Sequence, residues 1–327
     1  MTNSIVLGTG SYAPQRVISN ADLEKIVRTN DEWIVSRTGI KERRVAADDE
    51  ATSDLAAAAA DEALKFAGVK PDDVDMLIVC TVTGDTPTPS CASFVQARLG
   101  ARNAFAFDVG AACAGSLYGL SIADQFIKSG KAKRALVIGA ETLSRFVDWT
   151  NRETCVLFGD AAGAILLGAS EEQGRGVLAA SLRTDGSMTG ILGIYGGGSR
   201  RPPSPEMLED KAGKIKMRGR EVYKVATRLL PEVVGDTLKA AGLTAQDINH
   251  VIAHQANKRI IESAMQHLGV PLEKCWINID RYGNTSSASM PITLDEANRA
   301  GRLKKGDVIA MMAIGAGMTW GGAVLRW

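Results

Sequence analysis

An internal repeat constrains the fold of this chain more than any other feature. Residues 62–79 read EALKFAGVKPDDVDMLIV, and residues 236–253 read DTLKAAGLTAQDINHVIA, so that six positions are identical at an offset of 174. Each copy predicts a helix that ends near a glycine, a short loop and a buried strand. Matched segments of this length indicate a duplication rather than a chance likeness between two α/β units.

The similarity continues along the chain in the same order. Further matched pairs are a turn (108–113 and 280–285), a segment before a buried strand (129–134 and 300–305), the strand itself (135–139 and 308–313) and a closing glycine-rich strand (159–167 and 320–325). Repeated strand–helix alternation predicts an α/β fold of two duplicated halves, with mixed sheets packed in helix–sheet layers. We place the halves at residues 1–172 and 173–327.

One irregular stretch interrupts the second half. Residues 183–220 are rich in glycine and proline and include the run RRPPSP at 200–205. This composition predicts a cap-like insertion rather than a linker between independent domains.

Composition excludes several classes of function. The chain has 327 residues, 45% of them hydrophobic, and a net charge of +1, which disfavours disorder and nucleic acid as the main partner. Its five cysteines include no C-x-x-C pair, so we expect neither a disulfide framework nor a metal site, and we expect a reduced, cytoplasmic setting. The N-terminus reads as a first strand rather than a signal peptide, and no apolar run is long enough to cross a membrane.

A cysteine among very small residues is the first candidate nucleophile. Cys113 lies in the run AACAG at 111–115, between an apolar strand pattern at 104–109 and a helical pattern at 117–127. A position at the start of a helix favours thiolate over thiol, and the small neighbours leave room for an acyl group. The alternative is a buried structural cysteine, which is the commoner fate of this residue type.

The duplication can bring two further reactive residues to Cys113. His254 ends the strand of the second repeat, and Asn284 lies at the turn matched to that of Cys113. If the halves pack about a pseudo-twofold axis, all three side chains converge; the alternatives are a satisfied strand-end histidine and ordinary turn chemistry. His250 and His267 are interpreted as structural. A cysteine protease would also pair Cys with His, but a duplicated α/β chain matches that framework poorly.

Several motifs together resemble β-ketoacyl-acyl carrier protein synthase III, the initiating condensing enzyme of bacterial type II fatty acid synthesis in the thiolase superfamily. The resemblance covers residues 5–327 and is carried by GTGSYAP at 8–14, DEWIVSRTGI at 31–40, DVGAACAG at 108–115, FGDAAG at 158–163, HQAN at 254–257, GNTS at 283–286 and GAGMTWG at 315–321. It implies a thiolase-like fold and a homodimer.

The resemblance also implies a reaction. An acyl-CoA primer acylates Cys113, and malonyl-acyl carrier protein then loses CO2 and attacks the acyl-cysteine to give β-ketoacyl-acyl carrier protein. Neutral His254 and Asn284 stabilise the developing negative charge. No cofactor or metal is expected beyond the thioester substrates, and no membrane or nucleic acid partner. The alternatives are a secondary-metabolite condensing enzyme with another acyl donor or acceptor, and a non-catalytic homologue that binds the carrier protein.

Binding residues follow from the same resemblance. It implies an oxyanion hole from the backbone of Cys113 and Ala316, where many members have a glycine in place of this alanine. It further implies a coenzyme A site formed by Trp33, Arg37, Arg152, Gly219 and Asn257. It also implies a basic surface for the acidic carrier protein, formed by Lys258 and Arg259. Acetyl-selective members have a partner-subunit Phe at the position of Thr88, so Thr88 predicts a pocket for a primer longer than two carbons.

Overall fold

Two five-stranded sheets with the same strand order form the frame of the protein. The computed structural model describes residues 2–327. The first sheet has the order β1-β7-β6-β4-β5, with β1 at Asn3–Tyr12, β4 at Met76–Cys80, β5 at Phe105–Val109, β6 at Arg134–Thr142 and β7 at Asp160–Ser170. The second has the order β8-β14-β13-β11-β12, with β8 at Gly176–Thr184, β11 at His250–Ala253, β12 at Cys275–Trp276, β13 at Val308–Gly315 and β14 at Thr319–Arg326. Each sheet is mixed, as the duplication predicts.

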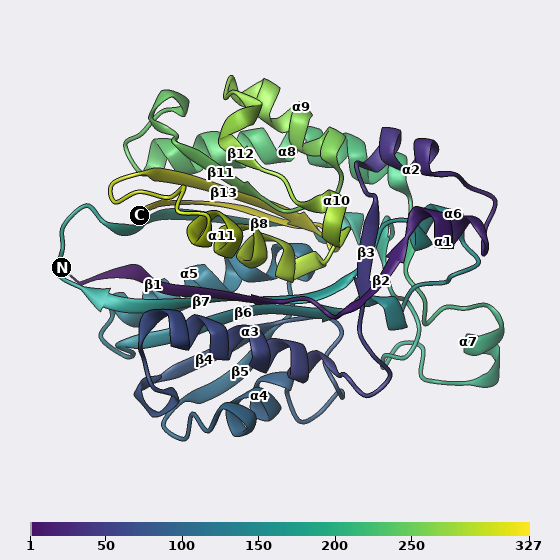
Figure 1. The fold of residues 1–327 in the computed structure, drawn as a ribbon, viewed down its shortest axis with the longest axis horizontal. Coiled ribbons are helices and arrows are strands. Elements are labelled where there is room, and N and C mark those ends of the chain that lie inside the picture. Colours follow the sequence, from purple (N-terminus) through teal and green to yellow (C-terminus); the bar gives the residue numbers. More distant parts are fainter. Residues whose placement is uncertain (1) are drawn as a thin grey trace.

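Helices separate and cover the two sheets, so that the molecule is built in five layers (Figure 1). The helices α5 (Gly115–Lys128) and α11 (Ser289–Arg299) lie between the sheets. The pair α3 (Thr52–Ala67) and α4 (Cys91–Leu99) covers the outer face of the first sheet, and α8 (Gly219–Ala240) and α9 (Lys258–Leu268) cover that of the second. Both repeats therefore have the predicted helix–loop–strand form, with left-handed Gly68 and Gly242 near the helix ends.

Strand β4 shows why the sequence folds in layers. All five of its residues are buried, and successive side chains point to opposite faces of the sheet. Met76 and Ile78 pack in the central layer against α5, whereas Leu77 and Val79 pack against α3 and α4. An apolar run without alternation is therefore the pattern of a strand covered on both faces.

The segments outside the duplicated frame gather at the end of the layers away from both termini (Figure 1). They are β2 (Arg16–Ser19), β3 (Glu42–Val45), α1 (Asn20–Glu24), α2 (Asp31–Thr38), α6 (Arg152–Cys155), α7 (Pro205–Glu209), β9 (Leu192–Gly193), β10 (Lys216–Met217) and α10 (Ile279–Tyr282). Leu192, Ile194 and Ile215, from the predicted insertion, pack here against Ile34 of α2 and its neighbours. The segment between β8 and α8, residues 185–218, is thus attached to the body as a cap, whereas the two ends of the predicted insertion at 183–220 belong to β8 and α8.

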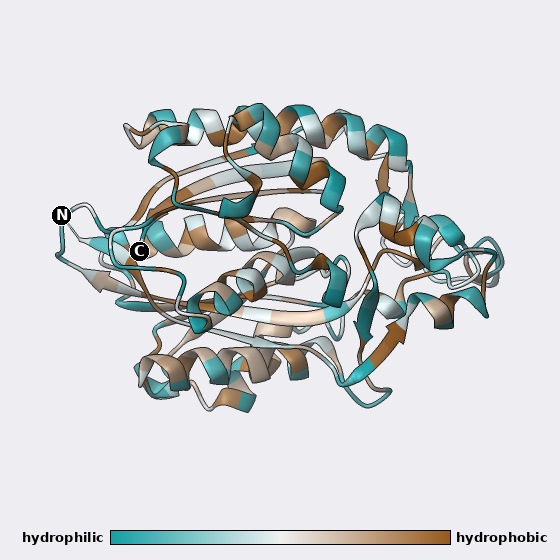
Figure 2. Cartoon of the chain, turned by 45° about the horizontal axis from the view of Figure 1, so that its top comes forward, coloured by the Kyte–Doolittle hydropathy of each residue, from teal (hydrophilic) through white to brown (hydrophobic). Residues whose placement is uncertain are grey.

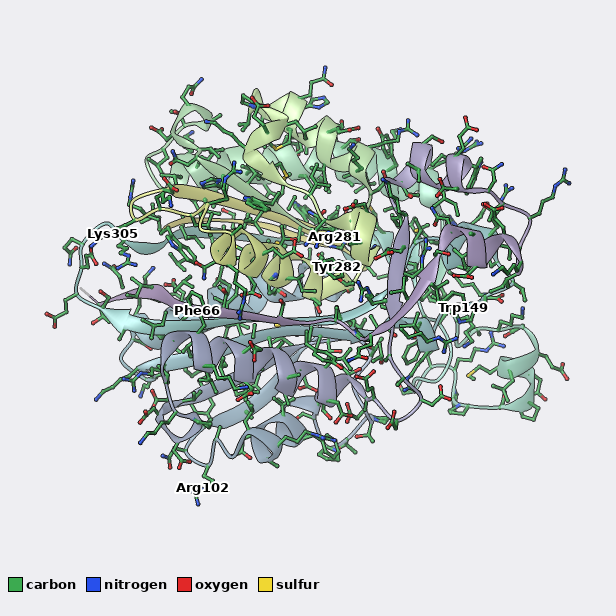
Figure 3. All side chains as sticks on the ribbon, viewed as in Figure 1. Phe66, Arg102, Trp149, Arg281, Tyr282 and Lys305 are labelled. Carbon is green, nitrogen blue, oxygen red and sulfur yellow. The ribbon has the colours of Figure 1, made fainter. Side chains whose placement is uncertain are left out.

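The surface is polar around this layered interior. Hydrophilic and hydrophobic residues alternate along the outer helices (Figure 2), and charged side chains such as Arg102 and Lys305 point outward (Figure 3). No helix within residues 2–327 combines the length and apolar character needed to span a membrane.

The structure corrects one detail of the repeat. Cys113 lies in a short 3-10 turn, η2 (Ala112–Ala114), and the equivalent turn is η7 (Ser286–Ala288), at the same offset of 174 as the rest of the repeat. Ala112 and Ser286 both have a left-handed backbone, with φ of 46° and 50°. The equivalent of Cys113 is therefore Ser287, and the match to residues 280–285 was wrong by two positions.

Candidate functional site

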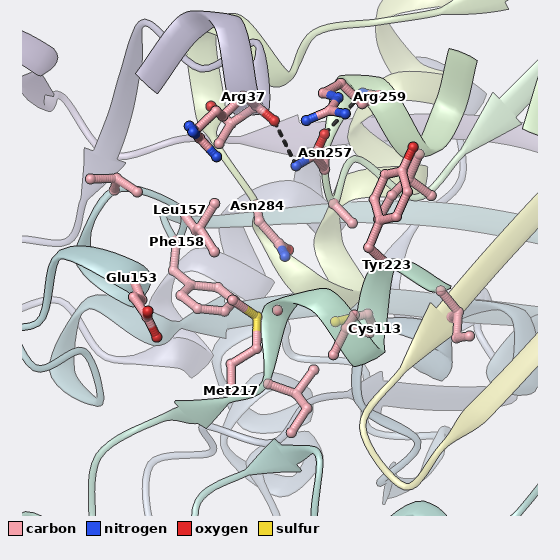
Figure 4. A pocket seen from close by; sticks show the side chains of 18 of the residues that line it. Arg37, Cys113, Glu153, Leu157, Phe158, Met217, Tyr223, Asn257, Arg259 and Asn284 are labelled. Carbon is pink, nitrogen blue, oxygen red and sulfur yellow. Dashed lines mark hydrogen bonds between the residues drawn. The ribbon is translucent and has the colours of Figure 1, made fainter. Parts of the chain in front are cut away.

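A cavity of about 380 Å³ opens from the surface to Cys113. Cys113, His254 and Asn284 all line it and are 8%, 5% and 6% exposed. They come from η2, from the residue after β11 and from the loop before η7, and Figure 4 shows Cys113 and Asn284 facing the same space. The predicted convergence of the three side chains is therefore present in the structure.

A second cavity, of about 290 Å³, lies on the other side of Cys113. Its lining is mostly apolar and consists of Val82, Ala112, Cys113, Leu143, Phe158, Leu192, Gly193, Ile194, Ile215, Ser286 and Ala316. Cys113, Phe158 and Leu192 line both cavities, so the sulfur lies where the two meet. The cap contributes much of the lining of the second cavity. The sequence predicted an acyl pocket but did not identify these cap residues as its lining.

Burial dominates the chemistry of Cys113. Desolvation raises the pKa of its thiol to about 12, opposed by a hydrogen bond with the Ser286 side chain. Burial therefore opposes the ionisation that the position just before helix α5 was expected to favour. The thiol needs a proton acceptor at the moment of reaction.

His254 is held neutral with one ring nitrogen free. Desolvation lowers its pKa to about 3. The ring Nδ1 lies 2.7 Å from Ser289 Oγ, while Nε2 is buried without a hydrogen-bond partner. The one hydroxyl proton of Ser289 is donated to the Ser286 carbonyl at 2.9 Å, so the Ser289 oxygen accepts from Nδ1–H, and in this arrangement Nε2 faces the cavity with a lone pair.

The side chain of Asn284 is oriented by its own turn. Its Oδ1 accepts a 2.9 Å hydrogen bond from the Ser286 backbone N–H, which leaves the NH2 group available as a donor. The backbone of Asn284 is fixed from β7 and the segment before it, since its N–H donates to Leu157 O at 2.8 Å and its carbonyl accepts from Gly159 N at 3.0 Å. Asn284 thus offers a hydrogen-bond donor beside Cys113, and His254 offers its unpaired Nε2.

The loop after β13 closes against the nucleophile turn. A Cβ on Gly315 would lie 2.5 Å from the Cys113 backbone nitrogen, so only glycine permits this approach. Thr319 Oγ1 joins the loop to the turn by donating to Ala111 O at 2.8 Å. Ala316 lines the second cavity, and it is not among the described non-glycine residues with positive φ. Its Cβ is therefore compatible with the backbone of this loop.

The outer end of the first cavity is basic and aromatic. The guanidinium groups of Arg37 and Arg152 lie over the Trp33 ring, 5.0 and 4.6 Å from its centroid. Trp33, Arg37, Gly219 and Asn257 line the cavity, and the Asn257 side chain donates to Arg37 O at 2.9 Å (Figure 4). Arg152 reaches the site only through its contact with Trp33.

The remaining predicted residues are placed differently. Arg259 lines the mouth of the first cavity, with its guanidinium 5.6 Å from the centroid of the Tyr223 ring. Lys258 points to Glu262, 3.8 Å away, and lines neither cavity. Thr88 is exposed and also lines neither cavity within one chain, so its predicted role depends on a second subunit.

Other groups at the site were missed by sequence reasoning. Glu141, Ser286 and Ser289 form a buried polar cluster beneath Cys113 and His254. The repeat offset of 174 makes Ser286 the equivalent of Ala112, but no signal in the sequence marks Glu141 or Ser289 as part of the site. Within residues 2–327, no three His, Cys, Asp or Glu side chains are grouped as a metal site requires.

Comparisons with known proteins agree with this geometry. A family model described as 3-oxoacyl-[acyl-carrier-protein (ACP)] synthase III matches residues 107–186, and the model of its C-terminal part matches residues 238–327. The chain is 51% identical over 322 residues to the beta-ketoacyl-[acyl-carrier-protein] synthase III of Caldanaerobacter subterraneus subsp. tengcongensis, which covers 98% of this chain and 97% of the relative.

Solved structures agree in both fold and sequence. The 3-oxoacyl-[acyl-carrier-protein] synthase III of Aquifex aeolicus VF5 superposes with a TM-score of 0.92 at 48% identity, covering 99% of this chain and 100% of the other. The corresponding Thermus thermophilus enzyme gives a TM-score of 0.91 at 44% identity, with 98% of each chain covered. Matches at 44–51% identity over nearly the whole chain, together with the convergence of Cys113, His254 and Asn284, show that the chain belongs to the β-ketoacyl-[acyl-carrier-protein] synthase III family.

Proposed function

We propose that this chain transfers an acyl group from coenzyme A to Cys113 and condenses it with malonyl-acyl carrier protein, initiating fatty acid synthesis. The observation that carries this proposal is the position of Cys113 between two cavities, with the side chains of His254 and Asn284 lining the first cavity beside it. One cavity suits a thioester arm that enters from solvent, and the other suits the acyl chain. Nothing in the site or the relatives favours the secondary-metabolite alternative.

The acyl-transfer half-reaction places negative charge on the thioester oxygen. The backbone N–H groups of Cys113 and Ala316 are our proposed oxyanion hole, supported by the close approach of Gly315 to Cys113. Backbone donors fixed in advance stabilise such an oxyanion without reorganisation.

The condensation half-reaction needs donors rather than a strong base, because loss of CO2 itself generates the carbanion. Neutral His254 and the Asn284 amide are the proposed donors to the malonyl thioester oxygen. For this role His254 takes the tautomer with its proton on Nε2, which requires Ser289 to turn its hydroxyl from the Ser286 carbonyl to Nδ1. The low pKa of His254 supports this role, since a charged imidazolium is disfavoured in the buried site.

The basic, aromatic mouth is our proposed coenzyme A site. Trp33 offers a face for adenine, and Arg37 and Arg152 offer charges for phosphate. Gly219 and Asn257 line the passage inward, where the pantetheine arm would lie. Arg259 and the neighbouring Lys258 begin helix α9 at the same mouth and are the proposed contacts for the acidic carrier protein.

The second cavity supports a primer longer than acetyl. An apolar cavity of about 150 Å³ can hold a benzene ring, and this cavity measures about 290 Å³. Leu192, Ile194 and Ile215 give it an apolar wall that would contact the far end of the acyl chain.

Strand β5 supports a homodimer. It is the last strand of the first sheet, so one of its edges has no partner strand within residues 2–327. Phe105 on this strand is 44% exposed and stacks beside Phe107. Exposed apolar edges of this kind associate readily, and a second copy would cover this one.

Intact-protein mass spectrometry tests the proposed function. The chain is incubated with acyl-CoAs of graded length and branching beside Cys113→Ala. We expect an acyl mass on the parent only, which disappears when malonyl-acyl carrier protein is added and β-ketoacyl product forms. Absence of any acyl adduct would overturn the proposal.

A further inference from the structure

Glu141 is a fully buried carboxylate at the end of β6, close to Cys113. No Lys, Arg or His in the described chain forms an ion pair with it. Instead, hydroxyl and backbone groups surround it: Thr81 Oγ1 (3.2 Å), Val82 N (3.2 Å) and Thr83 Oγ1 (2.6 Å) at Oε2, and Ser286 Oγ (3.0 Å) and Ser287 Oγ (3.1 Å) at Oε1. Burial of a carboxylate without a cation is costly, which calls for a function.

The two carboxylate oxygens have different partners. Oε2 accepts from the Val82 N–H and from the Thr83 hydroxyl, whose oxygen is already used as the acceptor for the Thr142 N–H at 2.9 Å. At Oε1, the Ser287 hydroxyl at 3.1 Å also contacts the Cys80 carbonyl at 2.6 Å, so its one proton is shared between two acceptors. Oε1 is therefore the less well satisfied of the two oxygens and is the one that can take up a proton.

Ser286 connects Oε1 to the nucleophile. Its hydroxyl contacts Glu141 Oε1 at 3.0 Å, and its side chain opposes the effect of burial on the pKa of the Cys113 thiol. Ser286 and Cys113 both line the second cavity, where the acyl chain is proposed to lie. The serine is thus the group beside Cys113 through which Glu141 would act.

The other nearby base is a poor acceptor. Burial raises the pKa of the Cys113 thiol to about 12 and lowers that of His254 to about 3. Burial also raises the pKa of Glu141, which makes this carboxylate a stronger base than an exposed one.

We propose that Glu141 receives the proton of Cys113 through the Ser286 hydroxyl and holds it while the acyl group is on the sulfur. The thiol proton passes to Ser286 Oγ as the serine's own proton passes to Oε1. The sulfur lone pair forms the new C–S bond, and the C–S bond to coenzyme A breaks, releasing a thiolate that solvent protonates. After condensation, Cys113 leaves as a thiolate and regains the proton by the reverse path. This inference rests on the proposed acyl transfer.

The other ionisable groups around the carboxylate are few. They are the thiols of Cys80 on β4 and Cys113 on η2, whose pKa values the Glu141 charge raises, and beyond Cys80 the Asp108 carboxylate on β5. A negative charge on Glu141 therefore disfavours a thiolate at either cysteine. Storage of the proton on Glu141 therefore also removes a charge that would disfavour the thiolate leaving group.

A pair of adjacent serines provides the first test. Ser286→Ala interrupts the path, whereas Ser287→Ala keeps it and removes only a side contact of Oε1. An alanine is compatible with the left-handed backbone at 286, because Ala112 has the same conformation in the other half. In rapid-quench acylation by acyl-CoA, we expect Ser286→Ala to be slower by about 10²-fold or more, and Ser287→Ala to lose less. Equal losses would overturn the path.

The pH profile of Glu141→Gln provides the second test. The parent acylation rate should level off above the pKa of the carboxyl group, whereas the variant should keep rising about tenfold per pH unit, because hydroxide must then remove the thiol proton. Infrared difference spectra should show a protonated carboxyl band in the acylated parent but not in the variant. Matching pH profiles, or no such band in the parent, would refute the inference; a parent that is not acylated at all would instead refute the proposed function.

Discussion

At the scale of single residues, burial sets the charge state of His254. Its folded pKa of about 3 lies below the value near 6.5 of an unfolded chain, so below pH 6.5 the unfolded state binds a proton that the native state does not. Stability is therefore lost as the pH falls from about 6.5 toward 3. In His254→Gln, the free energy of unfolding should fall less between pH 7 and pH 5, by about 2 kcal/mol. Urea unfolding at both pH values measures this, and an unchanged pH dependence would contradict it.

Primer length is decided by individual side chains at the second cavity. Val82 lines this cavity and is 44% exposed, so Val82→Phe adds volume without crowding the core. We expect it to shift the preferred primer to shorter chains in competition assays with mixed acyl-CoAs. Thr88→Phe should do the same only if Thr88 reaches this cavity from a second subunit. An unchanged preference in both variants would show that neither residue limits the chain.

Reactive residue types were predictable from the sequence, and their supports were not. Cysteine and histidine are rare in this chain, and Cys113, His254 and Asn284 lie at strand ends or turns, so a duplicated fold brings them together. Glu141 and Ser286 belong to common residue types separated by 145 positions in the chain. Their contact depends on how the two halves are packed, which no local pattern records.

At the scale of elements, the end of β13 must approach η2 closely. Gly315→Ala would force its Cβ against the Cys113 backbone nitrogen and displace a proposed oxyanion donor. We expect acylation to slow by about 10²-fold or more, measured by rapid quench with mass detection. Ala316→Gly is the matched control and should retain acylation, because it only removes a Cβ and keeps the backbone N–H at this position. Comparable losses in both variants would remove the oxyanion role of this loop.

The start of α9 presents a charge to the carrier protein. Arg259 is held over Tyr223 at the cavity mouth, so its charge has a defined position. Arg259→Glu should raise the KM for malonyl-acyl carrier protein by about tenfold or more. Arg228→Glu, an equal charge change at an exposed site on α8, is the control. The idea fails if both variants have the same KM.

Element boundaries show how far a repeat can be used. The helix–loop–strand units were predictable because their apolar spacing is regular. The nucleophile turn was misaligned by two residues because 3-10 turns of small side chains have no periodic pattern, and only the backbone identifies Ala112 with Ser286.

At the scale of the whole molecule, the free edge of β5 predicts association. Phe105→Lys places a charge on this edge and should convert a dimer into a monomer, as measured by light scattering or sedimentation. Phe66→Lys is the control, since Phe66 is exposed to a similar degree (49%) on α3, away from the edge. A parent that is already monomeric, or a variant that remains dimeric, would exclude β5 as the interface.

The overall architecture followed from the repeat, including the layers and the mixed sheets. The cap did not, because residues 183–220 lack a period and their place is decided by the apolar contacts of Leu192, Ile194 and Ile215. The frame is thus predictable from local patterns, whereas the second cavity depends on long-range packing.

The Cys113 turn η2 and its equivalent η7 each pack against the opposite half of the chain. Gly315 of the second half leaves room for the Cys113 turn, and Gly139 of the first half leaves room for the carbonyl of Ser287. Two separate, identical half-chains would need the same side chain at both turns, and hence two nucleophiles or none. Joined in one chain, the halves are free to diverge. One turn can then supply the sulfur, and the other can supply the polar side chains that lie beside it.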